Sequence, residues 1–129
     1  MRLYKPEALV SVLMQQALYR LTFHHEFDSA GNVTDFVNRI SLYSTKESKV
    51  PELVIIIQSP HEINSSSHER ANVQIANGSP LVWLIYKSKA LAEIYRDDGY
   101  VEILIAEEFL DGGIDFPALL ISVDSLFLP

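Results

Sequence analysis

Apolar and polar residues alternate with different periods along the chain, and each period predicts an element. In segment 7–20 the apolar residues recur at helical spacing, which is typical of an amphipathic helix, and Pro6 suits the first turn of that helix. Segment 21–27 alternates apolar and polar residues and therefore predicts a strand, which ends at the turn 28–32. A second strand is expected over 33–43.

The centre of the chain carries its most apolar pattern. Segment 53–57 is an unbroken run of Leu, Val and Ile, which is typical of a strand buried on both faces. A helix is then predicted from about Ser66 to Gly78, because Ser66 and Glu69 have the spacing of a capping box and glycine commonly ends a helix. A strand–helix–strand unit is thus expected at the centre of a mixed sheet.

The last third of the chain predicts a meander of strands. Strands are expected over 81–86, 91–96 and 100–105, with the turn Asp97-Asp98-Gly99 between the last two, because glycine accepts the positive φ that such turns require. Segment 119–127 predicts a short strand followed by a helical turn. Together the elements predict an α/β or α+β fold with one core, in a single domain over 1–129.

Length and composition agree with this expectation and exclude several kinds of site. The chain has 129 residues, of which 48% are hydrophobic and 21% charged, as in globular proteins. It has no cysteine, which excludes a disulfide framework, a thiol nucleophile and a thiolate zinc site. Polar residues interrupt the apolar segment 8–21, no cleavage site follows it, and no apolar run reaches the length of a membrane span. We therefore expect a cytoplasmic protein without a membrane segment.

The charges are unevenly distributed. The formal net charge is −7, and residues 97–129 contain eight acidic residues and no Lys or Arg. Residues 1–96 hold all ten basic residues and nine acidic ones. Affinity for a phosphate backbone grows with the number of phosphates that clustered cations neutralise, and the sequence contains no such cluster. If DNA is a partner, we expect it to bind weakly and through the first two thirds of the chain.

Several motifs occur in the order of a known family. Segment 51–60 reads PELVIIIQSP and resembles the signature strand of the Uma-type restriction endonucleases, which is approximately Pro-Asp-Leu-Val-Val-Glu-Val-Leu-Ser-Pro. That family belongs to the PD-(D/E)XK nuclease superfamily. Further segments with counterparts in the family are Glu69-Arg70, Gly78, 81–85 with Trp83, 95–99, 110–113 and 126–127. The resemblance covers about 51–127 and implies a restriction-endonuclease-like mixed sheet flanked by helices.

The resemblance also implies a place for the chemistry. Metal-assisted hydrolysis of a phosphodiester needs carboxylates that converge on Mg²⁺ or a similar ion, with a cation nearby for the developing charge. A family member supplies an Asp from an early strand, a Glu from the signature strand and a Lys from the following helix. The matching positions here are Asp35, Ile56 and Arg70, and the Asp of the signature strand is replaced by Glu52.

Isoleucine cannot bind a metal ion or accept a proton, so the resemblance implies a degenerate site. Asp35, Glu52 and Arg70 remain as vestigial catalytic candidates, and Mg²⁺ would bind Asp35 and Glu52 only in an active enzyme. Ordinary structural roles are the alternatives: Ile56 in the core, Glu52 on a solvated rim, Arg70 in water or paired with an acid, and Asp35 in a turn or edge. Trp83 is interpreted as a core aromatic residue.

The histidines do not form an evident metal site. His24 and His25 are neighbours on a predicted strand and point to opposite faces, so they cannot chelate one ion. His61 and His68 have no recognised zinc spacing.

Three functional hypotheses follow. The first is a degenerate nuclease-like protein without metal-dependent activity, which acts through binding or assembly. The second is an active metal-dependent DNA endonuclease whose second carboxylate is relocated to Glu26, Glu62 or Glu69. The third is a small protein-interaction module that dimerises through the exposed edge of the meander. Carboxylates that converge in a cleft would favour the second hypothesis, and an apolar cleft would favour the first.

Overall fold

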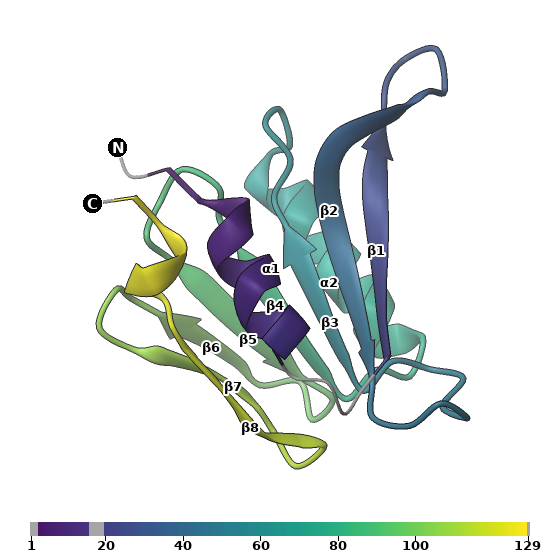
Figure 1. The fold of residues 1–129 in the computed structure, drawn as a ribbon, viewed down its shortest axis with the longest axis vertical. Coiled ribbons are helices and arrows are strands. Elements are labelled where there is room, and N and C mark those ends of the chain that lie inside the picture. Colours follow the sequence, from purple (N-terminus) through teal and green to yellow (C-terminus); the bar gives the residue numbers. More distant parts are fainter. Residues whose placement is uncertain (1–2, 16–19, 129) are drawn as a thin grey trace.

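A six-stranded mixed sheet forms the centre of the molecule (Figure 1). The computed structural model describes residues 3–15 and 20–128. In sheet order the strands are β1 (Arg20–Phe27), β2 (Val33–Tyr43), β3 (Leu53–Ile57), β4 (Leu81–Ile85), β5 (Ala92–Arg96) and β6 (Val101–Leu104). The remaining elements are α1 (Pro6–Gln15), α2 (Asn64–Ala76), the hairpin of β7 (Phe109–Gly112) and β8 (Phe116–Ser122), and the 3₁₀ turn η1 (Asp124–Leu126).

The central strands β3 and β4 are parallel and are connected by α2, whereas their neighbours pair antiparallel. All residues of both strands are buried, as the unbroken apolar pattern of 53–57 predicts for strands covered on two faces. The predicted strand–helix–strand unit in a mixed sheet is therefore confirmed, and so is the α+β class. The turn at Gly99 is confirmed as well, with a φ of 89°.

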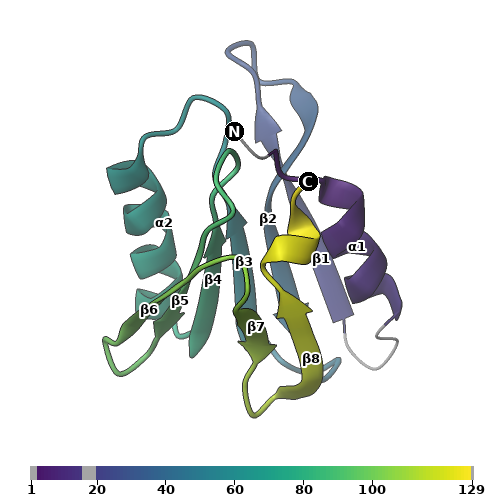
Figure 2. The same ribbon diagram turned by 90° about the vertical axis from the view of Figure 1, so that its left-hand side faces the viewer.

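Two layers cover the sheet, one on each face (Figure 2). α2 packs on one face, where Val54 and Ile56 of β3 lie among the buried residues. The alternate residues of β3 face the larger core, to which α1, η1 and the β7–β8 hairpin contribute. Trp83 lies in this larger core with no exposed surface, and its Nε1 donates to the Asp111 carbonyl at 3.0 Å. The hydrogen bond ties the hairpin to the sheet.

The end of the first helix and the start of the second differ from the sequence prediction. Residues 16–19 of the predicted helix 7–20 lie outside the described residues, and Arg20 already belongs to β1, where it pairs with Tyr43. The Arg20 guanidinium stacks 3.8 Å from the Tyr43 ring centroid, a contact that favours the strand. The second helix begins at Asn64 and has no side-chain cap, so the predicted capping box at Ser66 is wrong. The Asn64 side chain instead accepts a hydrogen bond from Gln58 Nε2 at 2.8 Å.

The β7–β8 hairpin was not predicted as a unit. A short strand followed by a helical turn was expected over 119–127, whereas β8 begins at Phe116 and pairs with β7. The turn between them depends on Gly113, whose φ is 70°, and on Gly112, where a Cβ would lie 2.4 Å from the Phe116 carbonyl oxygen. The predicted helical turn after the strand is confirmed as η1.

Other predictions about the whole molecule stay predictions. β6 is an edge strand of the described sheet, and the side chain of Ile103 on it is exposed. Dimerisation through this edge and the single-domain organisation of 1–129 are both untested. Within residues 3–15 and 20–128, none of the helices is long and apolar enough to cross a membrane.

Candidate functional site

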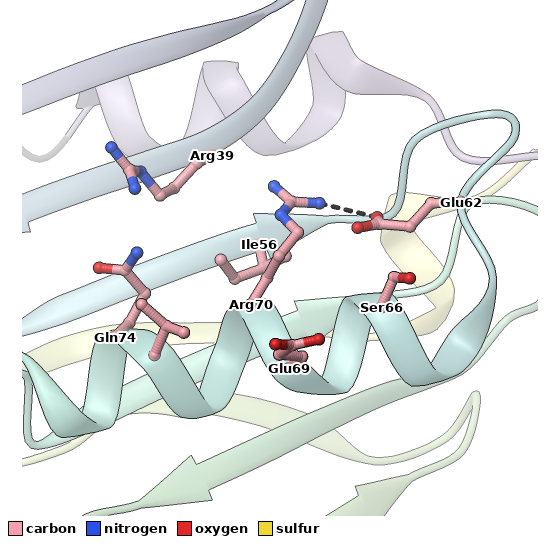
Figure 3. A pocket seen from close by; sticks show the side chains of 8 residues that line it. Arg39, Ile56, Glu62, Ser66, Glu69, Arg70 and Gln74 are labelled. Atoms are coloured by element: carbon pink, nitrogen blue, oxygen red, sulfur yellow. Dashed lines mark hydrogen bonds and ion pairs between the residues drawn. The ribbon is translucent and has the colours of Figure 1, made fainter.

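An open cleft of about 430 Å³ lies between α2 and the sheet (Figure 3). Ile56 forms part of its floor, and α2 contributes most of one wall. The polar side chains that line it are Arg39, Glu62, Ser66, Glu69, Arg70 and Gln74. The cleft thus contains Ile56, which matches the acidic position in the family resemblance, together with two arginines and two glutamates.

Strand register places charges at both ends of a row of side chains that crosses the sheet. Arg39 of β2 pairs with Ile56 of β3, Ile56 with Leu84 of β4, and Leu84 with Glu93 of β5. Side chains in register lie on the same face, so all four belong to the face covered by α2. Ile56 and Leu84 have no exposed surface. The position of Ile56 therefore lies beside a guanidinium, and that of Leu84 lies beside a carboxylate.

Arg70 is held across the cleft by two acceptors. It projects from α2 toward Glu62 (Figure 3), donating to Glu62 Oε1 at 2.7 Å and to the Asn38 carbonyl at 2.8 Å. The side chain of Glu62 is only 9% exposed and also accepts from the backbone N–H of Ser59. Arg70 and Ile56 thus lie in one cleft. The pairing of Arg70 with an acidic residue, one of its predicted structural roles, is confirmed, and the partner is Glu62.

Arg39 is a charged residue of the cleft that sequence reasoning missed. Its Nη2 lies 3.0 Å from His24 Nδ1, and its Nε is buried without a hydrogen-bond partner in the described residues. Burial lowers the pKa of Arg39, and the positive charge of Arg70 lowers it further. Burial also lowers the pKa of His24, with smaller contributions from Arg39 and His25, so the imidazole is neutral near pH 7. The alternation of β2 places Arg39 on one face, but only the register with β3 locates it beside Ile56.

Glu52 lies outside the cleft, at the start of β3. Its carboxylate accepts hydrogen bonds from the Ser44 backbone and hydroxyl, at 2.9 and 2.8 Å, and from the Ser48 hydroxyl at 3.0 Å. Burial alone would raise the pKa of Glu52, but these hydrogen bonds together outweigh it and lower the pKa below its ordinary value. The carboxylate organises the loop before β3, and its acceptor capacity is largely used there.

Asp35 also lies outside the cleft. Its side chain is exposed near the start of β2, four residues before Arg39 and beyond the stretch in which β2 pairs with β3. The four family-matched positions are therefore separated. Ile56 and Arg70 share the cleft, whereas Asp35 and Glu52 do not line it.

The residues described contain no group of three or more His, Cys, Asp or Glu side chains placed to hold a metal ion. Among the three carboxylates considered as relocated ligands, Glu62 and Glu69 line the cleft and Glu26 does not. Glu62 is engaged by Arg70, and Glu69 is exposed on α2.

A protein from Anabaena variabilis has a similar structure. It is described as "a putative nuclease belonging to DUF820", the Uma-type family, and the match has a TM-score of 0.66. The alignment covers 93% of this chain and 74% of the other, at 17% sequence identity. The two chains share a fold. No family model matches the sequence, and no curated protein matches it.

The shared fold agrees with the restriction-endonuclease-like sheet that the sequence resemblance implies. At 17% sequence identity, the comparison shows the fold alone. The sequence resemblance concerns the elements that form the cleft. β3 matches the signature strand of the family, and α2 matches the helix that follows it. The cleft of about 430 Å³ lies between these two elements.

A second polar cluster lies on the same face of the sheet, and sequence reasoning missed it too. Glu93 is 7% exposed and accepts a hydrogen bond from Tyr95 Oη at 2.9 Å. His68 Nε2 lies 2.7 Å from Tyr86 Oη and 3.4 Å from Glu93 Oε1. Burial raises the pKa of both tyrosines, and the Glu93 carboxylate raises it further, so both hydroxyls stay protonated. Tyr95 and His68 thus compensate for the burial of the Glu93 carboxylate. Glu93 lies at the opposite end from Arg39 in the row of side chains that crosses the sheet.

Proposed function

We propose that this chain is a restriction-endonuclease-like domain that lacks metal-dependent nuclease activity and acts through binding. The observation that carries the proposal is the surroundings of Ile56. This residue matches the acidic position of the family in the sequence resemblance, has no exposed surface, and belongs to a cleft that two arginines also line.

The chemistry of the cleft supports the absence of a metal. A divalent ion such as Mg²⁺ requires oxygen ligands, and the side chain of Ile56 offers only hydrocarbon. The guanidinium group of Arg39, which is in register with Ile56, repels a cation at the same place, because like charges interact unfavourably when water is partly excluded. Glu62 neutralises one of the two arginines and is thereby withdrawn from metal binding.

A cleavage assay tests the proposal directly. The purified chain is incubated with Mg²⁺ or Mn²⁺ and with supercoiled plasmid or single-stranded DNA, and products are separated on a gel. We expect no cleavage above that of a mock preparation. Metal-dependent cleavage that is lost in Asp35→Asn or Glu52→Gln would overturn the proposal, because it would show that the family-matched carboxylates still hold an ion.

An active nuclease with relocated carboxylates is the second candidate. The observation in its favour is that Glu62 and Glu69 line the same cleft as Ile56. This candidate predicts cleavage that is abolished by Glu62→Gln or Glu69→Gln and retained by Glu107→Gln, an exposed residue outside the cleft. Cleavage unaffected by any of these variants would identify a contaminating nuclease and would leave the proposal of an inactive domain standing.

A further inference from the structure

A second pocket, of about 270 Å³, adjoins the Ile56 cleft and shares Arg39 and Gln74 with it. β1 and β2, the loop before β3 and the C-terminal end of α2 surround it. Its polar lining includes Arg39, Lys49, Ser41, Gln74, Asn77 and Ser79, and none of its lining residues is Asp or Glu. In a chain with a net charge of −7, a pocket with two cations and no carboxylate is electrostatically distinct.

Two residues that line this pocket each have a buried polar atom without a hydrogen-bond partner among the described residues. Within the part of the chain that the structure describes, Arg39 Nε and Ser79 Oγ are the buried side-chain nitrogen and oxygen atoms without a hydrogen bond. Both residues line the pocket, and Ser79 is only 1% exposed. Native proteins rarely leave such atoms unsatisfied, and a bound ion, ligand or water is the usual explanation. Their coincidence in one pocket points to a shared occupant.

The chemistry of the two atoms defines what that occupant must offer. A guanidinium nitrogen can only donate, so the group opposite Arg39 Nε must accept a hydrogen bond. Ser79 Oγ can donate to the same group. Arg39 Nη2 donates to His24 Nδ1, which leaves the His24 proton on Nε2, 3.3 Å from Ser41 Oγ. His24 thus donates to the Ser41 oxygen, and the Ser41 hydroxyl proton remains available as a third donor.

The charges around the pocket favour an anion. Lys49 is exposed at the rim and adds a second formal positive charge to that of Arg39. The C-terminal end of a helix carries a partial negative charge that would oppose an anion. Here the carbonyls of the last turn of α2 already accept backbone hydrogen bonds from Asn77, Gly78 and Ser79, at 2.9, 3.0 and 3.1 Å, which reduces this opposition.

We propose that this pocket binds a phosphate-type oxyanion, with Arg39 Nε, Ser41 Oγ and Ser79 Oγ as donors and Lys49 as the rim cation. The pocket shares Arg39 and Gln74 with the Ile56 cleft, but the proposal does not depend on the absence of nuclease activity. Inorganic phosphate, a phosphate monoester and the diester of a nucleic-acid backbone offer the same tetrahedral acceptor chemistry. The test therefore includes one probe of each kind.

Binding is measured by NMR on the ¹⁵N-labelled full chain, with the Arg39 Nε–Hε and Ser79 backbone resonances as reporters. Inorganic phosphate, adenosine monophosphate and an oligothymidylate without terminal phosphates are titrated separately at constant ionic strength. We expect saturable shifts of both reporters with inorganic phosphate. Equal or tighter binding of the monophosphate would assign the site to monoesters. Binding of the oligothymidylate at the same reporters would assign it to backbone phosphates, and both outcomes support the proposal.

Substitutions of pocket residues test whether phosphate binds in this pocket. Ser79→Ala removes one donor and no satisfied hydrogen bond, so the variant should fold, and we expect its phosphate affinity to fall about tenfold. Lys49→Ala should weaken binding several-fold, whereas Lys46→Ala, an exposed lysine of the same loop that does not line the pocket, should leave it unchanged.

Two results would overturn the proposal. If neither reporter shifts with millimolar phosphate, the pocket holds only water. If Ser79→Ala and Lys49→Ala bind phosphate as well as the unmodified chain, the anion binds elsewhere. Neither result bears on the cleavage assay, so failure of this site and failure of the proposed function are distinguishable.

Discussion

The row of side chains from Arg39 to Glu93 predicts that a glutamate is tolerated better at position 56 than at position 84. Ile56 and Leu84 are in register on adjacent strands, and both are fully buried under α2. Ile56→Glu places a carboxylate beside Arg39, whereas Leu84→Glu places one beside Glu93. The two substitutions therefore differ mainly in the sign of the neighbouring charge.

The magnitude follows from Coulomb's law. Unit charges about 6 Å apart interact by about 3 kcal/mol at an effective dielectric constant of about 20. Loss of the aliphatic side chain is common to Glu and Gln, but only Glu carries the cost of dehydrating a charge, and that cost is of similar size at the two fully buried positions. The Glu–Gln difference in unfolding free energy at position 84 is therefore compared with the same difference at position 56. Relative to Gln, we expect Glu to be less stable at position 84 than at position 56 by about 3 kcal/mol or more, because Glu93 repels the new carboxylate and Arg39 attracts it.

The pH dependence should be steeper at position 84 than at position 56. Beside Glu93, both burial and the neighbouring carboxylate raise the folded-state pKa of an introduced glutamate above its unfolded value of about 4.3, so Leu84→Glu loses stability relative to Leu84→Gln as the pH rises from there. Beside Arg39, attraction to the guanidinium offsets part of the effect of burial. The folded-state pKa at position 56 should therefore lie below that at position 84, and Ile56→Glu should lose less stability relative to Ile56→Gln as the pH rises.

Urea unfolding monitored by Trp83 fluorescence measures these differences, because the chain has one tryptophan and its side chain is fully buried. If Leu84→Glu does not fold at neutral pH, the comparison is made near pH 4, where its carboxyl is largely protonated. An equal Glu–Gln difference at positions 56 and 84, at every pH, would refute the reasoning, because it would show that the Arg39 and Glu93 charges do not act on these positions.

Three further predictions concern the fold and its loops. Gly112→Ala should destabilise the chain by about 2 kcal/mol or more in urea unfolding, since its Cβ would lie 2.4 Å from the Phe116 carbonyl oxygen, and an unchanged midpoint would contradict that contact. Trp83→Phe should cost about 2 kcal/mol, because it deletes buried volume and leaves the Asp111 carbonyl without its 3.0 Å donor, as thermal unfolding would show. The lowered pKa of Glu52 contributes stability that is present above its unfolded pKa and lost as the pH falls through its folded-state pKa. Glu52→Gln should therefore flatten the acid limb of the stability profile, and an unchanged limb would show that the loop hydrogen bonds do not favour the ionised carboxylate.

The sequence by itself determined the centre of this protein. The apolar run 53–57, the helix that ends before Gly78 and the apolar strand that contains Trp83 predict the β3–α2–β4 unit, because burial on both faces requires uninterrupted hydrocarbon. The same pattern predicts that Ile56 is buried, and the resemblance identifies it as the acidic position of the family. Local periodicity is sufficient here because it reports which faces of an element meet the core.

Only the tertiary structure decided what surrounds that position. Arg39 is seventeen residues from Ile56 in the sequence and becomes its neighbour through the register of β2 and β3. The pairing of Arg70 with Glu62, and the meeting of Arg39 with Ser79 in one pocket, depend on how α2 lies on the sheet. Register and docking are set by the sum of many contacts between distant segments, and a pattern read along one segment carries no information about them. The chemistry available in either pocket is therefore a property of the assembled fold.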